Sequence, residues 1–259
     1  GIYPTLCTRD LVVFPSVLTP ILIGRAESKE LANMLEQNPE TVFCIFCQKH
    51  ADIDSPNQED LYETGTFAKL MRVINMPNDE HQKTIIVQGL GRCKMKQIVD
   101  KEPFYLADVE SLPETWPTEK EAEDPMFKAL TQTFFEESIK FIQYNENIPN
   151  EAVYAINEIT NRFVKCNFIC TSLPFTAEDK IKMLEQEKLS ERLIEALKAL
   201  HKEQKLLYLQ NEIRNKTQFD LDEQQKEYYL KQQIKNIKEE LGEGESSPEK
   251  KELLEKAKT

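Results

Sequence analysis

Two pairs of cysteines stand at spacings that could support thiol chemistry. Cys44 and Cys47 form a Cys-x-x-Cys sequence inside the apolar run VFCIFC, which is typical of a β-strand. Residues three apart on a strand face opposite sides of the sheet, whereas redox pairs of this spacing open a helix. Cys166 and Cys170 are one helical turn apart, but two ligands do not make a zinc site. We expect the first pair to pack in a core and the second to be core or surface thiols.

The histidines and glycines give no catalytic pattern. His50, His81 and His201 are far apart in sequence, and the His-Glu-x-x-His motif of zinc proteases does not occur. The chain also lacks a Gly-x-x-x-x-Gly-Lys-Ser/Thr phosphate loop. The short pattern Gly89-Leu90-Gly91 is predicted to be a plain hairpin turn. We therefore expect this chain to have no catalytic, cofactor-binding or metal-binding residues of its own.

Two adjacent aromatic pairs are candidates for binding another polypeptide. They are Phe134-Phe135 and Tyr228-Tyr229, both in stretches with helical periodicity. Neighbours on a helix point about 100° apart, so one ring of each pair can lie at the rim of an apolar stripe. An exposed ring could contact an unfolded chain. The alternative is that both pairs belong to a broad buried stripe.

Composition excludes several classes of protein. The net charge of -12 is spread along the chain without a basic stripe, so nucleic acid is an unexpected partner. No apolar run reaches the length of a membrane span, and no signal peptide is visible. Six cysteines in 259 residues do not form a disulfide scaffold, which favours reduced thiols in a cytosol-like compartment. The chain opens without Met, and we expect it to be a piece of a longer protein.

The chemistry-poor first part, residues 1–112, is predicted to be a compact β-rich domain. Most of the Gly and Pro residues fall here, between runs rich in β-branched and aromatic residues. Residues 76–80 are predicted to form a turn between antiparallel strands. Buried strands are predicted at 11–14 and 21–23, further strands at 42–48, 66–75, 84–88, 93–99 and 104–111, and one helix at 28–37.

The second part of the chain is predicted to be helical. A linker at 113–124 ends with Thr118 and Glu121 at capping-box spacing. A bundle at 125–207 follows, with helices at 127–145, 150–165 and 176–187. A helix without Gly or Pro then spans 190–241 and would be about 78 Å long. Its first half supplies the fourth wall of the bundle through Leu193, Leu197, Leu200 and Leu207.

The long helix is predicted to change character along its length. After a polar window at 214–227, the apolar residues resume a 4-3-4 spacing that is typical of a coiled-coil seam. These candidate assembly residues are Leu230, Ile234, Ile237 and Leu241. Gly242 should end the helix. Residues 242–259 are predicted to be a hinge and the start of a further helix at Ser247-Pro248.

Three blocks of sequence resemble the N-terminal region of the Lon protease family. The blocks occur in the family's order, although Cys7 stands where the family usually has Pro and the loop at 76–82 varies in length within it. The matching stretches are LCTRDLVVFP at 6–15 with Pro20 and Gly24-Arg25, DLYETGT at 60–66 with Ala68-Lys69 and VQGLGR at 87–92, and KEYYLKQQ at 226–233 with KEELG at 238–242.

The resemblance implies a fold and a role. The expected fold class is α+β: a PUA-like β-rich domain with one or two helices, then a helical bundle extended by the long helix or coiled-coil arm. The family's full-length members are hexameric ATP-dependent serine proteases, cytoplasmic in bacteria or alternatively in the mitochondrial matrix. ATP and Mg bind in a motor that this chain stops before, so it should have no ATPase or peptidase activity. Its expected role is to recognise damaged or tagged proteins and to support hexamer assembly.

Other interpretations remain open at the level of sequence. The chain could be mainly an oligomerisation or spacer scaffold that binds little substrate itself. It could be a stand-alone adaptor, although the helix begun at Ser247 argues against that. A thiol oxidoreductase using Cys44 and Cys47 would require them to open a helix rather than lie on a strand.

Overall fold

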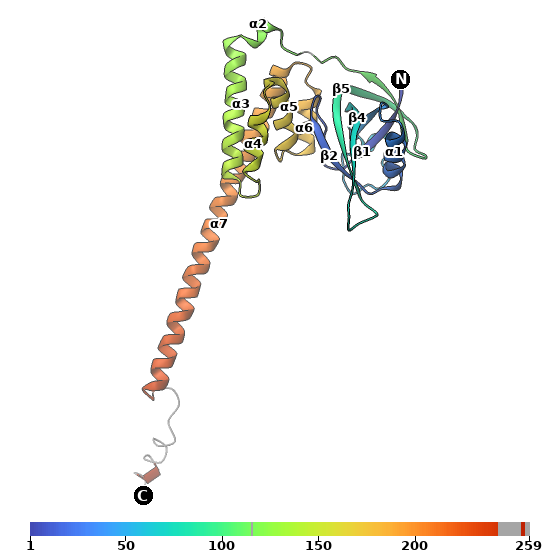
Figure 1. The fold of residues 1–259 in the computed structure, drawn as a ribbon. Coiled ribbons are helices and arrows are strands. Elements are labelled where there is room, and N and C mark those ends of the chain that lie inside the picture. Colours follow the sequence, from blue (N-terminus) through green and yellow to red (C-terminus); the bar gives the residue numbers. More distant parts are fainter. Residues whose placement is uncertain (115, 243–254, 257–259) are drawn as a thin grey trace. The chain divides into compact units, whose positions relative to one another are not determined.

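The chain has an α+β fold, with a β-sheet part followed by helices (Figure 1). The structure is a computed structural model that describes residues 1–114, 116–242 and 255–256. Its six strands form one sheet in the order β2-β5-β4-β3-β1-β6, and β6 also pairs with β5. The pairing of β5 with β6 closes β1, β3, β4, β5 and β6 into a ring. The strands are β1 (Ile2–Thr8), β2 (Leu18–Ile23), β3 (Val42–Cys47), β4 (Thr64–Asn75), β5 (Lys83–Asp100) and β6 (Tyr105–Ser111).

The curled sheet buries a different apolar cluster on each face. On β3, Phe43 and Ile45 belong to one cluster, while Cys44 and Phe46 belong to the other. This alternation follows from the two-residue period of a strand. Helix α1 (Ala26–Gln37) covers the first cluster with Leu31, Ala32 and Leu35. This helix was predicted at 28–37. The strand alternation thus explains why both faces of β3 are apolar.

Two elements predicted in the first part do not form. Residues 11–14 are not a strand, although Val12, Val13 and Phe14 are buried. The predicted turn at 89–91 does not exist, because β5 continues through both glycines as one strand. A side chain at Gly89 would overlap the Phe14 carbonyl group. Gly89 is therefore explained by the close approach of residues 14–15, not by a turn.

The helical elements largely follow their predicted starts. Thr118 and Glu121 form a reciprocal capping box at α2, and Thr176 caps α6. The helix predicted at 150–165 is instead two helices, because Asn161 caps a new start with its side chain. The helices are α2 (Glu119–Ala122), α3 (Pro125–Tyr144), α4 (Glu151–Glu158), α5 (Arg162–Ser172), α6 (Ala177–Glu185) and α7 (Leu189–Glu240).

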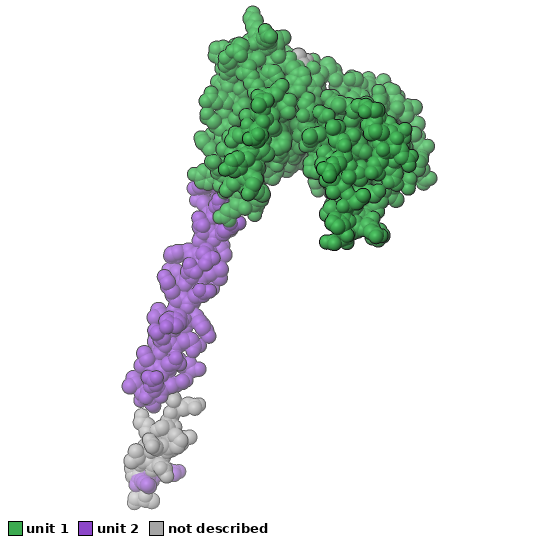
Figure 2. Space-filling view, in the orientation of Figure 1, with its two compact units in different colours: residues 1–204 green, residues 205–259 purple. Residues whose placement is uncertain are grey.

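The chain forms two compact units, residues 1–204 and 205–259 (Figure 2). The first unit contains the sheet, α1 to α6 and the first turns of α7. There Leu193 and Leu200 are fully buried, as predicted for the fourth wall, and Leu197 is half-buried. Leu207, also predicted for that wall, is half-buried and belongs to the second unit. From 205 to 242 no side chain is buried, and Gly242 adopts the positive φ of 73° that favours glycine after a helix. The further helix predicted from Ser247 begins outside the described residues.

Candidate functional site

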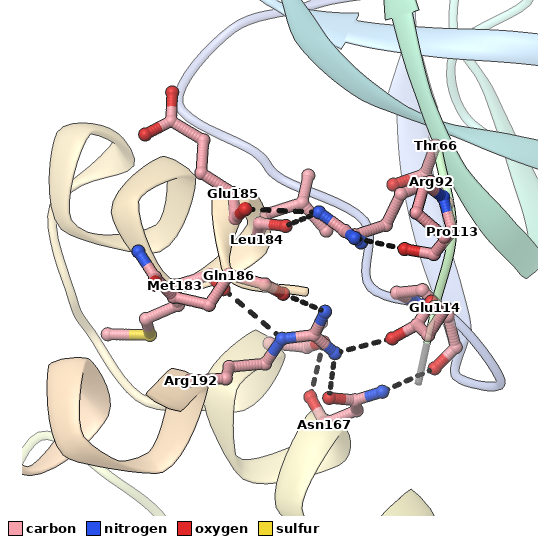
Figure 3. Close-up of polar contacts among 12 residues, drawn as sticks. Thr66, Arg92, Pro113, Glu114, Asn167, Met183, Leu184, Glu185, Gln186 and Arg192 are labelled. Atoms are coloured by element: carbon pink, nitrogen blue, oxygen red, sulfur yellow. Dashed lines mark hydrogen bonds and ion pairs between the residues drawn. The ribbon is translucent and has the colours of Figure 1, made fainter. Parts of the chain in front are cut away.

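A buried arginine on β5 holds the sheet against the helices of the first unit. Arg92 donates from Nη1 to the carbonyl oxygens of Leu184 and Glu185, both at 3.1 Å, and from Nη2 to that of Pro113. Burial, and then the nearby charge of Arg192, lower the pKa of Arg92. Figure 3 shows Arg92 reaching the carboxyl end of α6. The sheet is therefore positioned by backbone carbonyl groups rather than by a carboxylate.

A second buried arginine, Arg192 at the start of α7, completes this junction (Figure 3). Its guanidinium donates to the Met183 carbonyl at 3.1 Å and to the Asn167 side chain at 2.8 Å. It also forms an ion pair of 2.8 Å with Glu114. Asn167 in turn donates to the Pro15 carbonyl at 3.1 Å. This junction is structural, and it fixes the segment that leads into β2.

Strand β2 is an edge strand with one side unpaired. Among the described strands it pairs with β5 alone. The Val17 carbonyl accepts from Gly89 on β5, so the backbone groups of the odd-numbered residues point toward β5. Those of Leu18, Pro20 and Leu22 then point away from it. Pro20 agrees with this geometry, because a proline without an N–H can lie on a strand only where no ladder bond is needed.

The outer face of β2 and its neighbours is apolar and exposed. Leu18 and Leu22 are 56% and 60% exposed, so the prediction that Leu22 is buried was wrong. In the register of the sheet, Pro20 lies opposite the half-buried Ile86 on β5. Leu22 lies opposite Thr84 on β5, and Thr84 lies opposite Ile74 on β4. Directly opposed residues share a face, so these side chains form one surface. We call Leu18, Pro20, Leu22, Ile86 and Ile74 the β2 face.

A groove of about 350 Å³ lies at the carboxyl end of β2, where Ile21, Leu22 and Ile23 line it. It lies between β2 and the end of β1, and its apolar residues include Leu6, Leu11, Ile21 and Ile23. At one end the Arg25 guanidinium donates to the Cys7 carbonyl at 2.6 Å. Edge strands beside an apolar groove are a recurring way to bind extended peptides. The sequence signal that could have revealed this edge is Pro20 within a short, mostly apolar strand.

The predicted aromatic candidates lie in different surroundings. Phe134 is completely buried, so its prediction as a substrate contact was wrong and the buried-stripe alternative applies to it. Phe135 is half-buried, and the Lys165 ammonium lies 5.2 Å from the centroid of its ring. Tyr228 and Tyr229 on α7 are exposed, at 66% and 63%. The two pairs belong to separate units.

The predicted assembly residues form an exposed stripe on α7. Leu230, Ile234, Ile237 and Leu241 are each more than half exposed. Apolar residues at this spacing remain unpaired in a single helix, so their burial requires another helix. The stripe stays a prediction of assembly.

The thiols occupy core positions, as expected for Cys44 and Cys47. All six cysteines are free and buried. Burial raises the pKa of Cys7 and of Cys170 to about 12, so both are protonated at neutral pH. In the described part of the chain, no three His, Cys, Asp or Glu side chains gather closely enough to hold a metal ion. No helix of the described residues has the length and apolarity needed to cross a membrane.

The sheet and the helices of the first unit match a known family. Residues 2–202 fit the family described as the ATP-dependent protease La (LON) substrate-binding domain. The chain belongs to this LON family. The match includes the β2 face and the arginine junction, and it stops within α7.

Relatives and solved structures agree with the LON assignment. The chain is 34% identical over 256 residues to a Lon protease of Flavobacterium johnsoniae, covering 99% of this chain and 31% of that protein. It is 35% identical over 257 residues to a Lon protease of Porphyromonas gingivalis, covering 99% and 30%. The N-terminal domain of Mycobacterium avium complex Lon protease has the same fold, with a TM-score of 0.56 and 17% identity over 78% of this chain and 98% of that one. The chain spans about a third of the length of these curated relatives.

Proposed function

We propose that this chain is the non-catalytic N-terminal part of an ATP-dependent Lon serine protease, and that it captures unfolded or damaged proteins. The observation that carries the proposal is the pair of exposed leucines, Leu18 and Leu22, on an edge strand that has one unpaired side. Unfolded proteins expose apolar side chains and unpaired backbone groups, and both can bind at such an edge. The family description of a substrate-binding domain supports capture, and the bacterial relatives favour a bacterial protein, for which we propose a cytoplasmic location.

Capture by one copy is weak, because the β2 face is small. The full-length protein is proposed to be a hexamer with an AAA+ motor, as the family resemblance implies. Six copies of the β2 face around one assembly raise the effective concentration of binding sites for a captured chain. Weak contacts at each copy then combine into a useful overall affinity.

A second proposed function is assembly. The stripe of Leu230, Ile234, Ile237 and Leu241 favours it, because an exposed coiled-coil seam is stabilised by a partner helix. On this alternative the chain is mainly a scaffold that orders the hexamer. The two functions use different units, so they can be tested separately.

Binding of the 259-residue chain to one model protein, in its unfolded and folded forms, tests substrate capture. The unfolded form should bind at least ten times more tightly. Replacing Leu18 and Leu22 by serine should weaken that binding about tenfold, because two apolar contacts are lost. The matched control is Ile2→Ser, which alters a strand residue that is 61% exposed at another site. Equal affinity for the two forms, or equal loss in the control, would contradict capture at the β2 face.

A further inference from the structure

The unpaired side of β2 offers an incomplete row of backbone hydrogen-bonding groups. The carbonyl groups of Leu18, Pro20 and Leu22 are available on that side, but only the two leucines supply N–H groups, because proline has none. A missing donor in the middle of an edge limits pairing with other strands, which protects the protein from aggregation. The same edge remains able to hold one short extended segment weakly and reversibly.

The sheet around β2 differs in charge from the rest of the chain. The whole chain has a net charge of -12, yet β2, β4 and β5 as far as residue 92 contain four basic and no acidic residues. Lys69 is paired with Glu40, Lys83 donates to the Asn33 side chain, and Arg92 is buried in the junction. Arg72 is exposed, and no ion pair is recorded for it among the described residues. It lies opposite Ile86, which lies opposite Pro20, so it is in the middle row of the β2 face.

We infer that β2 binds substrate by strand addition, and that it selects extended segments with apolar residues at alternate positions and carboxylates between or beside them. This inference rests on the proposed function and names its substrate class. One set of alternate side chains would lie against the exposed leucines, and the other would lie over the groove containing Leu6, Leu11 and Ile21. The backbone bonds make recognition tolerant of sequence, as protein quality control requires.

The charge selection acts through the field of the sheet rather than by direct contact. Neighbouring strands are about 4.8 Å apart, so Arg72 on β4 is about 10 Å from β2. That distance is close to the Debye length at about 0.1 M salt. The preference for acidic segments is therefore modest, and it disappears at high ionic strength.

Synthetic peptides that bind the 259-residue chain distinguish strand addition from general apolar adhesion. The parent probe is a ten-residue peptide that alternates valine with glutamate. Two derivatives carry N-methyl groups on one or the other alternate set of residues, which removes backbone donors but keeps the side chains. Strand addition predicts that at least one derivative binds about tenfold more weakly. If both bind as well as the parent, strand addition is wrong.

Two protein variants test the same geometry from the other side. Pro20→Val restores the missing N–H and should tighten binding of the parent peptide about fivefold, the equivalent of one backbone hydrogen bond. The unchanged chain should bind the glutamate peptide a few-fold more tightly than a lysine version in about 50 mM salt, and equally at about 0.5 M. Arg72→Gln should remove this difference in affinity. No gain in Pro20→Val, or a preference that ignores salt, would overturn the inference.

Failure of this inference and failure of the proposed function are distinguishable. If unfolded protein binds through Leu18 and Leu22 while N-methylation of the peptide has no effect, substrate capture is supported and strand addition is wrong. If neither peptides nor unfolded proteins bind, both fall and the assembly role remains.

Discussion

Arg192 in α7 and Asn167 in α5 are joined by a hydrogen bond of 2.8 Å from Nη1 to Oδ1. Asn167 also donates from Nδ2 to the carbonyl oxygen of Pro15, in the segment before β2. One side chain therefore links the first turn of α7 to the segment that carries the β2 face. Local sequence patterns do not reveal this link, because Asn167 and Pro15 lie 152 residues apart.

Loss of Arg192 should destabilise the first unit strongly. Arg192→Ala leaves the Glu114 carboxylate and several carbonyl groups without their donor, and we expect a loss of about 3–5 kcal/mol in the free energy of unfolding. Urea denaturation followed by circular dichroism measures it. Lys198→Ala, which removes an exposed ion pair on the same helix, should cost less than about 1 kcal/mol. Similar losses for the two variants would contradict the role of the junction.

The two glycines of β5 should differ in their response to substitution by alanine. A methyl group at Gly89 would overlap the Phe14 carbonyl oxygen and lie 2.9 Å from its carbon, whereas Gly91 has open space. We expect Gly89→Ala to cost about 1–3 kcal/mol and Gly91→Ala to be nearly neutral. Thermal unfolding of both variants measures the difference. Equal midpoints would mean that residues 14–15 move to accommodate the methyl group without loss of stability.

The stability of the chain should fall at alkaline pH because of its buried thiols. Burial raises the pKa of Cys170 from 9.0 to about 12, so between these values the unfolded chain binds fewer protons than the folded chain. Stability therefore falls as pH rises above 9, by up to about 1.4 kcal/mol per pH unit for this thiol. Urea midpoints between pH 8 and 10 measure the slope.

Cys170→Ala provides the control for that slope. The variant should be less stable at every pH, because it leaves a small cavity, but its loss of stability above pH 9 should be shallower. An unchanged slope would assign the effect to other groups.

Charges in the α7 stripe should disrupt assembly without unfolding the sheet. Ile234→Asp combined with Ile237→Asp places carboxylates in the seam, where burial against another helix would be costly. Sedimentation should then show less self-association, or none in the full-length protein. The circular dichroism and unfolding midpoint of the first unit should stay unchanged. A loss of its fold would mean that the stripe packs within the monomer.

Local sequence features predicted the elements whose causes are local. The capping pair of Thr118 and Glu121, the cap at Thr176 and the glycine at 242 each act within a few residues, and all three are confirmed. The predicted turn at 89–91 was wrong because β5 continues through it, and Gly89 is there because the distant Phe14 carbonyl group approaches it closely. The domain boundaries at 112, 124 and 207 remain predictions.

The candidate site was less accessible to sequence reasoning than the fold. Phe134 and Leu22 are both large apolar residues in periodic stretches, yet the first is completely buried and the second is 60% exposed. Burial depends on which neighbours cover a face. On β2, Ile21 and Ile23 lie on the face that α1 covers, whereas Leu22 lies on the opposite face.

The sequence by itself determined the α+β class, the long helix and the LON family, because these rest on periodicity, on local caps and on motifs read in order. Tertiary structure alone decided that β2 lies at an edge, that Leu18 and Leu22 are exposed, and that Arg92 and Arg192 are buried. The physical reason is that exposure, edge position and the pairing of buried charges depend on contacts between segments far apart in the chain, which no local pattern encodes.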